Sequence, residues 1–257
     1  MNLYKSLCSI LSIIILLPSH IIAEYKPNYQ REQNINEQII NYLFDSEVMQ
    51  LNSELETQFN LIYNSKENEK HSILLLHGRG LNPDEQAVMG PLRIELDKSG
   101  YNVFSLQLPV LAKGSSYSDY QKIFKYSNSR ITSALKYINT NSLIIVAHSC
   151  GSHMLTSWLT ENNQDNLLGL VLLGAGAVDK GEIMIDKINY NKLNIPILNV
   201  IGENDHGSVM LNNIEFEKYY LNKHHHSKSI SIDGSDHNYQ DKSDIMIDVV
   251  KEWLKSL

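Results

Sequence analysis

The sequence is poor in cysteine, proline and glycine, and these shortages exclude several classes of protein. Its 257 residues include 2 cysteines, 6 prolines and 13 glycines, while 42% of them are hydrophobic. This composition excludes collagen-like repeats, disulfide-dense scaffolds and disordered chains, because it supplies enough apolar side chains for a sizeable core. Length alone allows one or two domains. The chain has no internal repeat and no linker rich in proline or glycine, which favours one domain.

Positive charge is also scarce. The chain has 22 lysines and arginines against 29 aspartates and glutamates, a net charge of -7, and it contains no basic run. A phosphate backbone would mostly be repelled by this charge. We therefore expect no nucleic-acid partner.

The first 23 residues are almost without charge. Lys5 is their only charged residue, the run 7–17 is almost wholly apolar, and a small residue, Ala23, ends the segment. This order predicts a signal peptide over residues 1–23 that is cleaved after Ala23. The alternative is an uncleaved membrane anchor, although several polar residues dilute the segment. We expect export to a bacterial periplasm or secretion, no stable membrane anchor after cleavage, and a single mature domain over residues 24–257.

Cleavage would leave one cysteine in the mature chain. Cys8 lies in the predicted signal peptide, so Cys150 alone would remain. A disulfide within the mature chain is then impossible. Such an exported protein must be stabilised by its core.

Short β-rich runs alternate with longer helical ones after a polar stretch at 25–36. The first two runs predict an antiparallel edge hairpin, and the later, mostly apolar runs predict buried strands. The segments between the later strands repeat apolar residues at intervals of three and four, as at 88–96, 131–138 and 246–254. The pattern predicts an α/β fold with one doubly wound, mostly parallel sheet. The expected strands are 47–52, 57–64, 72–76, 102–108, 143–147, 168–173, 197–201 and 229–232.

The turn around Ser149 has the pattern of a nucleophile elbow. A predicted strand ends in Ala147-His148-Ser149-Cys150-Gly151 and passes directly into a helical segment. Such a turn is sharp, so the residues two before and two after the nucleophile must be small. Alanine replaces the usual first glycine here. An ordinary helix start at Ser149 is the alternative interpretation.

Three further loops follow predicted strands and carry chemically useful residues. The strand at 72–76 runs into His77-Gly78-Arg79-Gly80, a glycine-bearing turn of the kind that supplies a backbone N–H to an oxyanion hole. The residues after this turn, 82–85, predict a helix start. Asp205 follows the strand at 197–201, and His237 follows the strand at 229–232. Ligands and catalytic groups in such sheets sit on the loops that leave the carboxyl ends of the strands. Nucleophile, acid and base thus appear in the order Ser, Asp, His.

Residues 72–257 resemble the alpha/beta hydrolases of the serine hydrolase type. A narrower resemblance, to a bacterial group of exported, largely uncharacterised hydrolase-like proteins, rests on 75–84, 90–92 and 105–109. The general resemblance implies a serine hydrolase that works through an acyl-enzyme. The chain departs from the family pattern at Ala147, and it has no long insertion, so we expect no large lid.

The physical requirements of acyl transfer assign a role to each candidate residue. His237 would accept the proton of Ser149, and Asp205 would orient the imidazole and stabilise its cation. The backbone N–H groups of Arg79 and Cys150 would bind the oxyanion. The expected substrate is a small-molecule or acyl-bearing ester or thioester, with no cofactor and no metal. The alternative function is a non-catalytic envelope binding protein that retains the fold.

Several residues remain as weaker candidates. Asp179 is an alternative acid, and Cys150 is an alternative nucleophile, since a helix N-terminus would lower its pKa. The run 224–226 consists of three histidines that could bind a metal, but a solvated helix end is the preferred interpretation. We expect three other histidines to pack or to meet backbone groups, and an exposed Arg79 side chain to be solvated. These histidines are His77, His148 and His153.

Overall fold

The computed structural model describes residues 24–56, 58–65, 71–163, 165–184 and 188–257. The predicted signal peptide lies outside these residues, and its cleavage stays a prediction. Within the described part of the chain, no helix is both long enough and apolar enough to cross a membrane.

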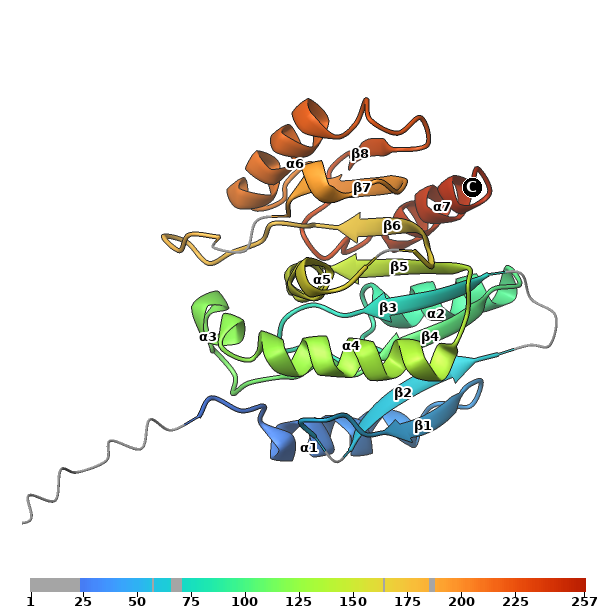
Figure 1. Cartoon of the computed structure of the whole chain (residues 1–257), viewed down its shortest axis with the longest axis vertical. Helices are drawn as coiled ribbons and strands as arrows, with labels where there is room; N and C mark the ends of the chain where they lie inside the picture. Colours follow the sequence, from blue (N-terminus) through green and yellow to red (C-terminus); the bar gives the residue numbers. More distant parts are fainter. Residues whose placement is uncertain (1–23, 57, 66–70, 164, 185–187) are drawn as a thin grey trace, which may run out of the picture.

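The described residues form an eight-stranded sheet in the order β1-β2-β4-β3-β5-β6-β7-β8 (Figure 1). β1 and β2 form an antiparallel hairpin, β2 pairs antiparallel with β4, and all other neighbours are parallel. The predicted fold class is therefore confirmed. The strands are β1 (Glu47–Leu51), β2 (Phe59–Asn64), β3 (Ser72–Leu76), β4 (Asn102–Leu106), β5 (Leu143–His148), β6 (Leu167–Leu173), β7 (Ile197–Gly202) and β8 (Lys228–Ile232).

The apolar runs become central strands because both faces of the sheet are covered. Every residue of β3, β5 and β7 is buried. The parallel register places Leu76 beside Ala147, and His148 beside Leu173. The carboxyl ends of neighbouring strands thus meet at one edge of the sheet, and the loops that follow them converge there.

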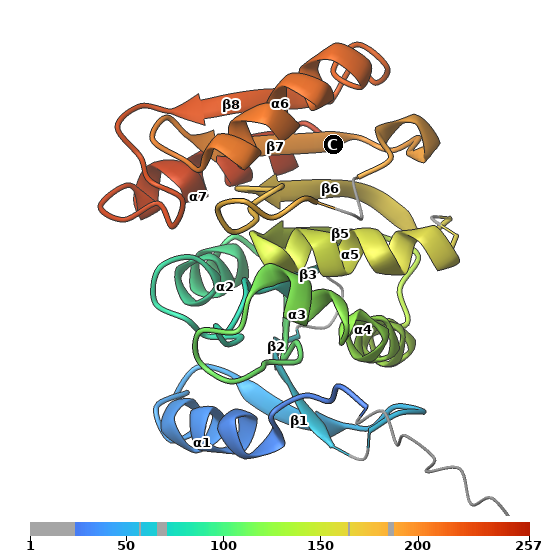
Figure 2. The same cartoon turned by 90° about the vertical axis from the view of Figure 1, so that its left-hand side faces the viewer.

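Helices cover the sheet on both faces (Figures 1 and 2). On one face α2 (Met89–Lys98) and α7 (Ser243–Leu254) pack over one apolar core that includes Leu92 and Val250. The second core, on the opposite face, includes residues of α3, α4, α5 and α6. These helices are α3 (Tyr117–Gln121), α4 (Phe124–Ile138), α5 (Cys150–Glu161) and α6 (Gly207–Tyr219), and a short 3-10 helix, η1 (Tyr190–Lys192), precedes β7.

The structure corrects the sequence interpretation at two helix starts. The stretch 25–36, interpreted only as polar, contains most of α1 (Tyr29–Ile40), of which Glu32 is the buried residue. The helix expected to begin near Asn82 begins at Met89 instead. The carboxylate of Glu85 explains the delay, because it accepts hydrogen bonds from three successive N–H groups at the helix start, of Ala87, Val88 and Met89, at 2.8–2.9 Å.

A buried charge cluster attaches α1 to the rest of the fold. The Arg130 side chain of α4 is fully buried, and its guanidinium donates to Glu56 at 2.7 Å and to Glu32 at 2.9 Å. A third donation reaches the carbonyl of Gln107 at 3.0 Å. Buried carboxylates and a buried guanidinium are tolerated because each satisfies the others.

We expect Arg130→Met to destabilise the fold strongly. The substitution would leave the carboxylates of Glu32 and Glu56 buried without their cation, and breaking such a cluster costs about 3–5 kcal/mol. Urea denaturation followed by circular dichroism measures the loss in free energy of unfolding. A loss below about 1 kcal/mol would show that the cluster contributes little.

Candidate active site

Ser149 lies at a strained turn between β5 and α5. Its φ is 52° and its ψ is -123°, a conformation that side-chain-bearing residues rarely adopt. Its backbone N–H donates to the carbonyl of Leu173 at 2.8 Å. The strand before the turn and the helix after it therefore fix the serine at the carboxyl edge of the sheet.

The neighbours of Ser149 explain why one glycine of the elbow is needed and the other is not. A Cβ at Gly151 would lie 2.5 Å from the carbonyl oxygen of Leu76 and 2.6 Å from that of His77. Those are backbone atoms that cannot move aside cheaply. Ala147, by contrast, is an ordinary strand residue whose side chain is fully buried. The departure from the family pattern at Ala147 thus leaves the turn intact.

The structure brings together Ser149, His237 and Asp205, which the sequence places far apart. His237 Nε2 lies 2.8 Å from Ser149 Oγ, and His237 Nδ1 lies 2.7 Å from Asp205 Oδ1. Because an ionised carboxylate only accepts hydrogen bonds, Nδ1 carries the proton and Nε2 is free to accept from the serine hydroxyl. The imidazole is therefore in the tautomer that a general base requires.

Asp205 is held firmly at the end of β7. Its side chain is fully buried, and it also accepts hydrogen bonds from the backbone N–H groups of His206, at 2.7 Å, and Gly202, at 3.4 Å. Three donors thus face one carboxylate. Such a carboxylate can orient the imidazole without itself rotating.

The turn after β3 lies directly beside the elbow. A Cβ at Gly78 would be 3.3 Å from the Cβ of Ser149 and 3.2 Å from Nδ1 of His148, so a side chain here would push its neighbours apart by a few tenths of an ångström. The carbonyl of Gly78 accepts from His77 Nδ1 at 2.8 Å and from the N–H of Leu81 at 3.2 Å. In a trans peptide the following N–H, that of Arg79, points the opposite way. The turn that contains Arg79 thus lies beside Ser149. Cys150, the second predicted oxyanion donor, is the first residue of α5, so its N–H has no acceptor within the helix.

His77 is a structural hydrogen-bonding residue beneath this turn. Its Nε2 lies 3.0 Å from the backbone N of Leu108, which can only donate, so Nε2 accepts and Nδ1 carries the hydrogen. Complete burial lowers the pKa of His77 to about 4. The ring therefore stays neutral and holds the Gly78 carbonyl at neutral pH.

Asp179 and Arg79 form an ion pair at the rim of the site. The two guanidinium nitrogens of Arg79 meet the two carboxylate oxygens of Asp179 at 2.5 and 2.6 Å. The guanidinium holds the pKa of Asp179 down at about 2. The Arg79 side chain is thus paired, contrary to the expectation that it is solvated. Asp179 binds Arg79 whereas Asp205 binds His237, so the geometry favours Asp205 as the acid.

Cys150 is unsuited to act as a nucleophile. Its side chain is 2% exposed, and burial raises the pKa of the thiol to about 12. The expectation that the helix N-terminus lowers this pKa is wrong, because removal from water outweighs the helix dipole. The thiol stays protonated at neutral pH.

The other histidines fall into two groups. His148 and His153 are buried, and each has Nε2 3.2 Å from a backbone carbonyl, that of His237 and that of Ala177 respectively. Both thus meet backbone groups as expected. The run 224–226 lies in the turn after α6 rather than at a helix end.

Sequence reasoning missed His206. Its ring centroid is 4.6 Å from that of His237, and the residue lines the same cavity. Asp205, His206 and His237 bring one potential metal-binding atom each to within 4.8 Å of one another. The sequence did contain one signal for His206, which directly follows the candidate acid Asp205 just after a buried strand.

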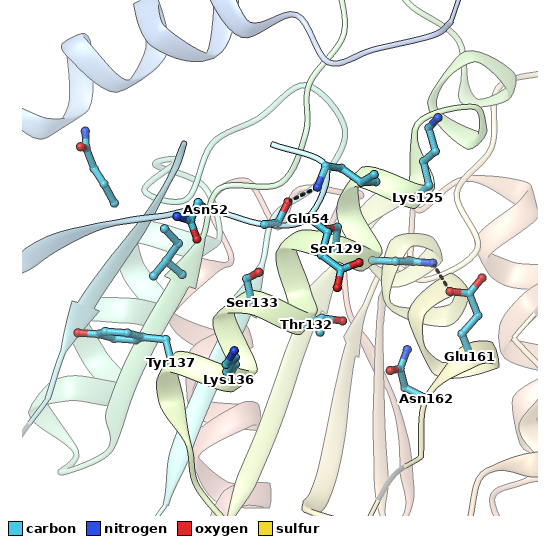
Figure 3. A pocket seen from close by; sticks show the side chains of 15 residues that line it. Asn52, Glu54, Lys125, Ser129, Thr132, Ser133, Lys136, Tyr137, Glu161 and Asn162 are labelled. Atoms are coloured by element: carbon cyan, nitrogen blue, oxygen red, sulfur yellow. Dashed lines mark hydrogen bonds between the residues drawn. The ribbon is translucent and has the colours of Figure 1, made fainter. Parts of the chain in front are cut away.

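Ser149 opens into a cavity of about 460 Å³. Histidines 148, 206 and 237, Tyr117 and the Arg79–Asp179 pair contribute to its walls. A larger groove of about 990 Å³ lies elsewhere, between α4 and the segment after β1 (Figure 3). It is lined mostly by hydroxyl, amide and charged side chains, with Leu51 and Leu55, but among the described residues by no histidine. The chemistry of acyl transfer therefore points to the smaller cavity.

No protein-family model matches the chain, and no curated protein matches its sequence. Solved structures do match its fold. A predicted CIB-like hydrolase from Thermoplasma acidophilum is 18% identical, with a TM-score of 0.63 over 82% of this chain and 99% of the other. An esterase from Pyrococcus furiosus is 14% identical, with a TM-score of 0.65 over 84% and 93%. A carboxylesterase from Bacillus subtilis is 10% identical, with a TM-score of 0.59 over 88% and 96%.

These likenesses and the strand order define the class of fold. The protein has the alpha/beta-hydrolase fold, and its structural neighbours are esterases and hydrolases. At identities of 10–18% the comparisons establish the fold and carry no substrate with them.

We expect Gly174→Ala to disable the site without unfolding the protein. A Cβ at Gly174 would lie 2.8 Å from Cε1 of His237 and would displace the imidazole. Ester turnover should fall by a factor on the order of 10², as expected for a small misplacement of a catalytic group. Gly181→Ala is the matched control, because Gly181 also has a positive φ but nothing lies within 4 Å of its added Cβ. Equal turnover losses in the two variants would contradict this explanation.

Proposed function

We propose that the protein is a serine hydrolase that cleaves an ester or thioester through an acyl-enzyme intermediate. The observation that carries this proposal is the hydrogen-bonded chain from Asp205 through His237 to Ser149. A serine hydroxyl is a weak nucleophile until an adjacent base accepts its proton. This arrangement supplies that base and orients it.

In the first half-reaction Ser149 Oγ attacks the acyl carbon while His237 Nε2 takes the hydroxyl proton. The buried Asp205 carboxylate stabilises the imidazolium that forms. The N–H groups of Arg79 and Cys150 bind the oxyanion of the tetrahedral intermediate. His237 then gives its proton to the leaving alcohol or thiol, and the acyl group remains on Ser149.

In the second half-reaction a water molecule replaces the leaving group. His237 accepts a proton from the water, whose oxygen attacks the acyl carbon through a second oxyanion in the same place. The proton returns to Ser149 Oγ as the carboxylic acid leaves. Every proton thus moves through one imidazole nitrogen, Nε2, while Nδ1 stays bonded to Asp205.

The size and lining of the cavity favour a small or medium substrate. A volume of about 460 Å³ accommodates an acyl group and part of an alcohol. Charged and polar groups make up much of the wall, with Leu81, Ala177 and Val178 as its aliphatic members. We propose short acyl chains over long ones on this basis.

Covalent labelling and ester turnover test the proposal together. Purified residues 24–257 are treated with a fluorophosphonate probe and assayed with p-nitrophenyl esters of increasing chain length, with a chelator present because of the potential metal-binding atoms described above. We expect one probe per chain and faster turnover of the shorter esters. If the protein shows no labelling and no turnover, the proposal is overturned, and a binding protein that retains the fold is favoured.

Ser149→Ala and Cys150→Ser distinguish the two adjacent candidate nucleophiles. Ser149→Ala should abolish labelling and lower ester turnover by a factor on the order of 10³ or more. Cys150→Ser should retain most activity, because the proposed contribution of this residue is its backbone N–H. Labelling that persists in Ser149→Ala and disappears in Cys150→Ser would establish a cysteine mechanism instead.

Asp205→Asn and Asp179→Asn distinguish the two candidate acids. Asp205→Asn should lower kcat by a factor on the order of 10³ or more, since an amide would favour the wrong imidazole tautomer. Asp179→Asn should lower it much less, because that carboxylate bonds Arg79 and the N–H of Tyr117 rather than His237. Steady-state kinetics with one ester measures both. The reverse order of effects would exchange the two assignments.

A further inference from the structure

We propose that Arg31, in the first turn of α1, is a positioning residue for the oxyanion hole. This inference rests on the proposed function, in which the N–H of Arg79 binds the oxyanion. It goes further in assigning a catalytic effect to a helix that contributes no residue to the cavity around Ser149.

The guanidinium of Arg31 connects α1 to two loops at the carboxyl edge of the sheet. One nitrogen, Nη2, donates to the carbonyl of Gly80 at 2.8 Å, and the other, Nη1, donates to the carbonyl of Leu111. Gly80 belongs to the turn after β3, and Leu111 belongs to the loop that follows β4. A planar guanidinium suits this bridge because its two nitrogens can donate to two carbonyls at once. We expect the smaller ammonium group of a lysine to reach only one of them.

The contact with Gly80 matters because it holds the backbone on the second side of Arg79. On one side of Arg79, the carbonyl of Gly78 is held by His77 and by the N–H of Leu81. On the other side, the carbonyl of Gly80 is held by Arg31. Gly80 has a φ of 69°, in the left-handed region that favours glycine. Because glycine adopts many other backbone conformations as well, this peptide needs a contact to hold its orientation. Loss of Arg31 would therefore loosen the turn at the residue next to the oxyanion donor.

The position of Arg31 is fixed because polar contacts hold the first turn of α1. The side chain of Asn28 caps the helix by accepting the N–H of Arg31 at 3.0 Å, and the N–H of Asn28 donates to Val110 at 2.7 Å. The carboxylate of Glu32 accepts from the N–H of Val110 at 2.9 Å and from buried Arg130. Because Glu32 is the buried residue of α1, the helix fills little of the apolar core. Its contacts instead converge on the turn and the loop beside the site.

If α1 only stabilised the fold, substitutions at its different contacts would have similar effects on turnover. If Arg31 positions the oxyanion hole, substitutions at Arg31 and elsewhere on α1 should differ. Asn36, one turn further along α1, donates to the side chain of Gln107 at 3.1 Å, so Asn36→Leu removes a docking contact without touching the turn at Gly80. Arg31→Met removes the contacts with Gly80 and Leu111. Both variants should lower the melting temperature, but only Arg31→Met should change the oxyanion hole.

The test compares Arg31→Met, Arg31→Lys and Asn36→Leu with the wild type. We expect Arg31→Met to lower kcat about tenfold or more with KM within about twofold, since a displaced oxyanion donor weakens only the transition state. Affinity for an aryl boronic acid, whose serine adduct is a tetrahedral anion, should fall by the same factor. Arg31→Lys should recover part of the loss, and added guanidinium chloride at millimolar concentration should restore part of kcat in Arg31→Met. Asn36→Leu should keep wild-type kcat at temperatures where it is folded.

Hydrogen exchange separates failure of this inference from failure of the proposed function. Amide exchange across residues 78–81 should rise in Arg31→Met and not in Asn36→Leu, whether or not the protein hydrolyses esters. Unchanged exchange in this turn would overturn the inference. With an active wild type, an unchanged kcat in Arg31→Met, or equal losses of kcat in Arg31→Met and Asn36→Leu, would overturn it as well. An inactive, unlabelled wild type with raised exchange would overturn the proposed function while retaining the mechanical role of Arg31.

Discussion

The close approach of the β5–α5 turn to the end of β3 is the constraint on which the rest of the site depends. Gly151 permits it, since any Cβ there would lie within 2.6 Å of two backbone carbonyls. At this turn Ser149 has a positive φ, and its side chain lies beside the turn that contains Arg79. The strain at Ser149 is of the kind that costs about 1–3 kcal/mol and persists only where surrounding structure fixes it. Here a parallel sheet on both sides of β5 does so.

Burial then sets the charge of each group around the serine. His77 and His148 are fully buried, and desolvation lowers the pKa of each to about 4, so both act as neutral hydrogen-bonding rings. Burial keeps the Cys150 thiol protonated, while Asp179 remains ionised against Arg79. His237 differs from these two histidines in its contacts, because its two ring nitrogens lie within hydrogen-bonding distance of Asp205 and Ser149. Proton transfer is thereby concentrated on one imidazole.

The sequence was sufficient for the sheet and for the three residues that now lie within hydrogen-bonding distance of one another. Continuous apolar runs such as 72–76 and 143–147 leave little choice of structure, and parallel strands bring the loops after them to one edge. What the sequence could not indicate depends on long-range polar contacts. α1 has no apolar stripe to detect, because it docks through Arg31 and Glu32, and the pairing of Arg79 with Asp179 joins residues 100 positions apart. The delayed start of α2 follows from a cap by Glu85, which no periodicity signals.

The mass of the protein during turnover of a p-nitrophenyl ester tests the proposed acyl-enzyme most directly. Rapid acid quenching within the first turnover, followed by mass spectrometry of the intact chain and of its peptides, detects any covalent intermediate. We expect the chain to gain the mass of one acyl group, located on Ser149, and we expect this species to form before the steady state and to decay with water. Ester turnover without any acylated chain, or an acyl group on Cys150, would refute the proposed serine mechanism.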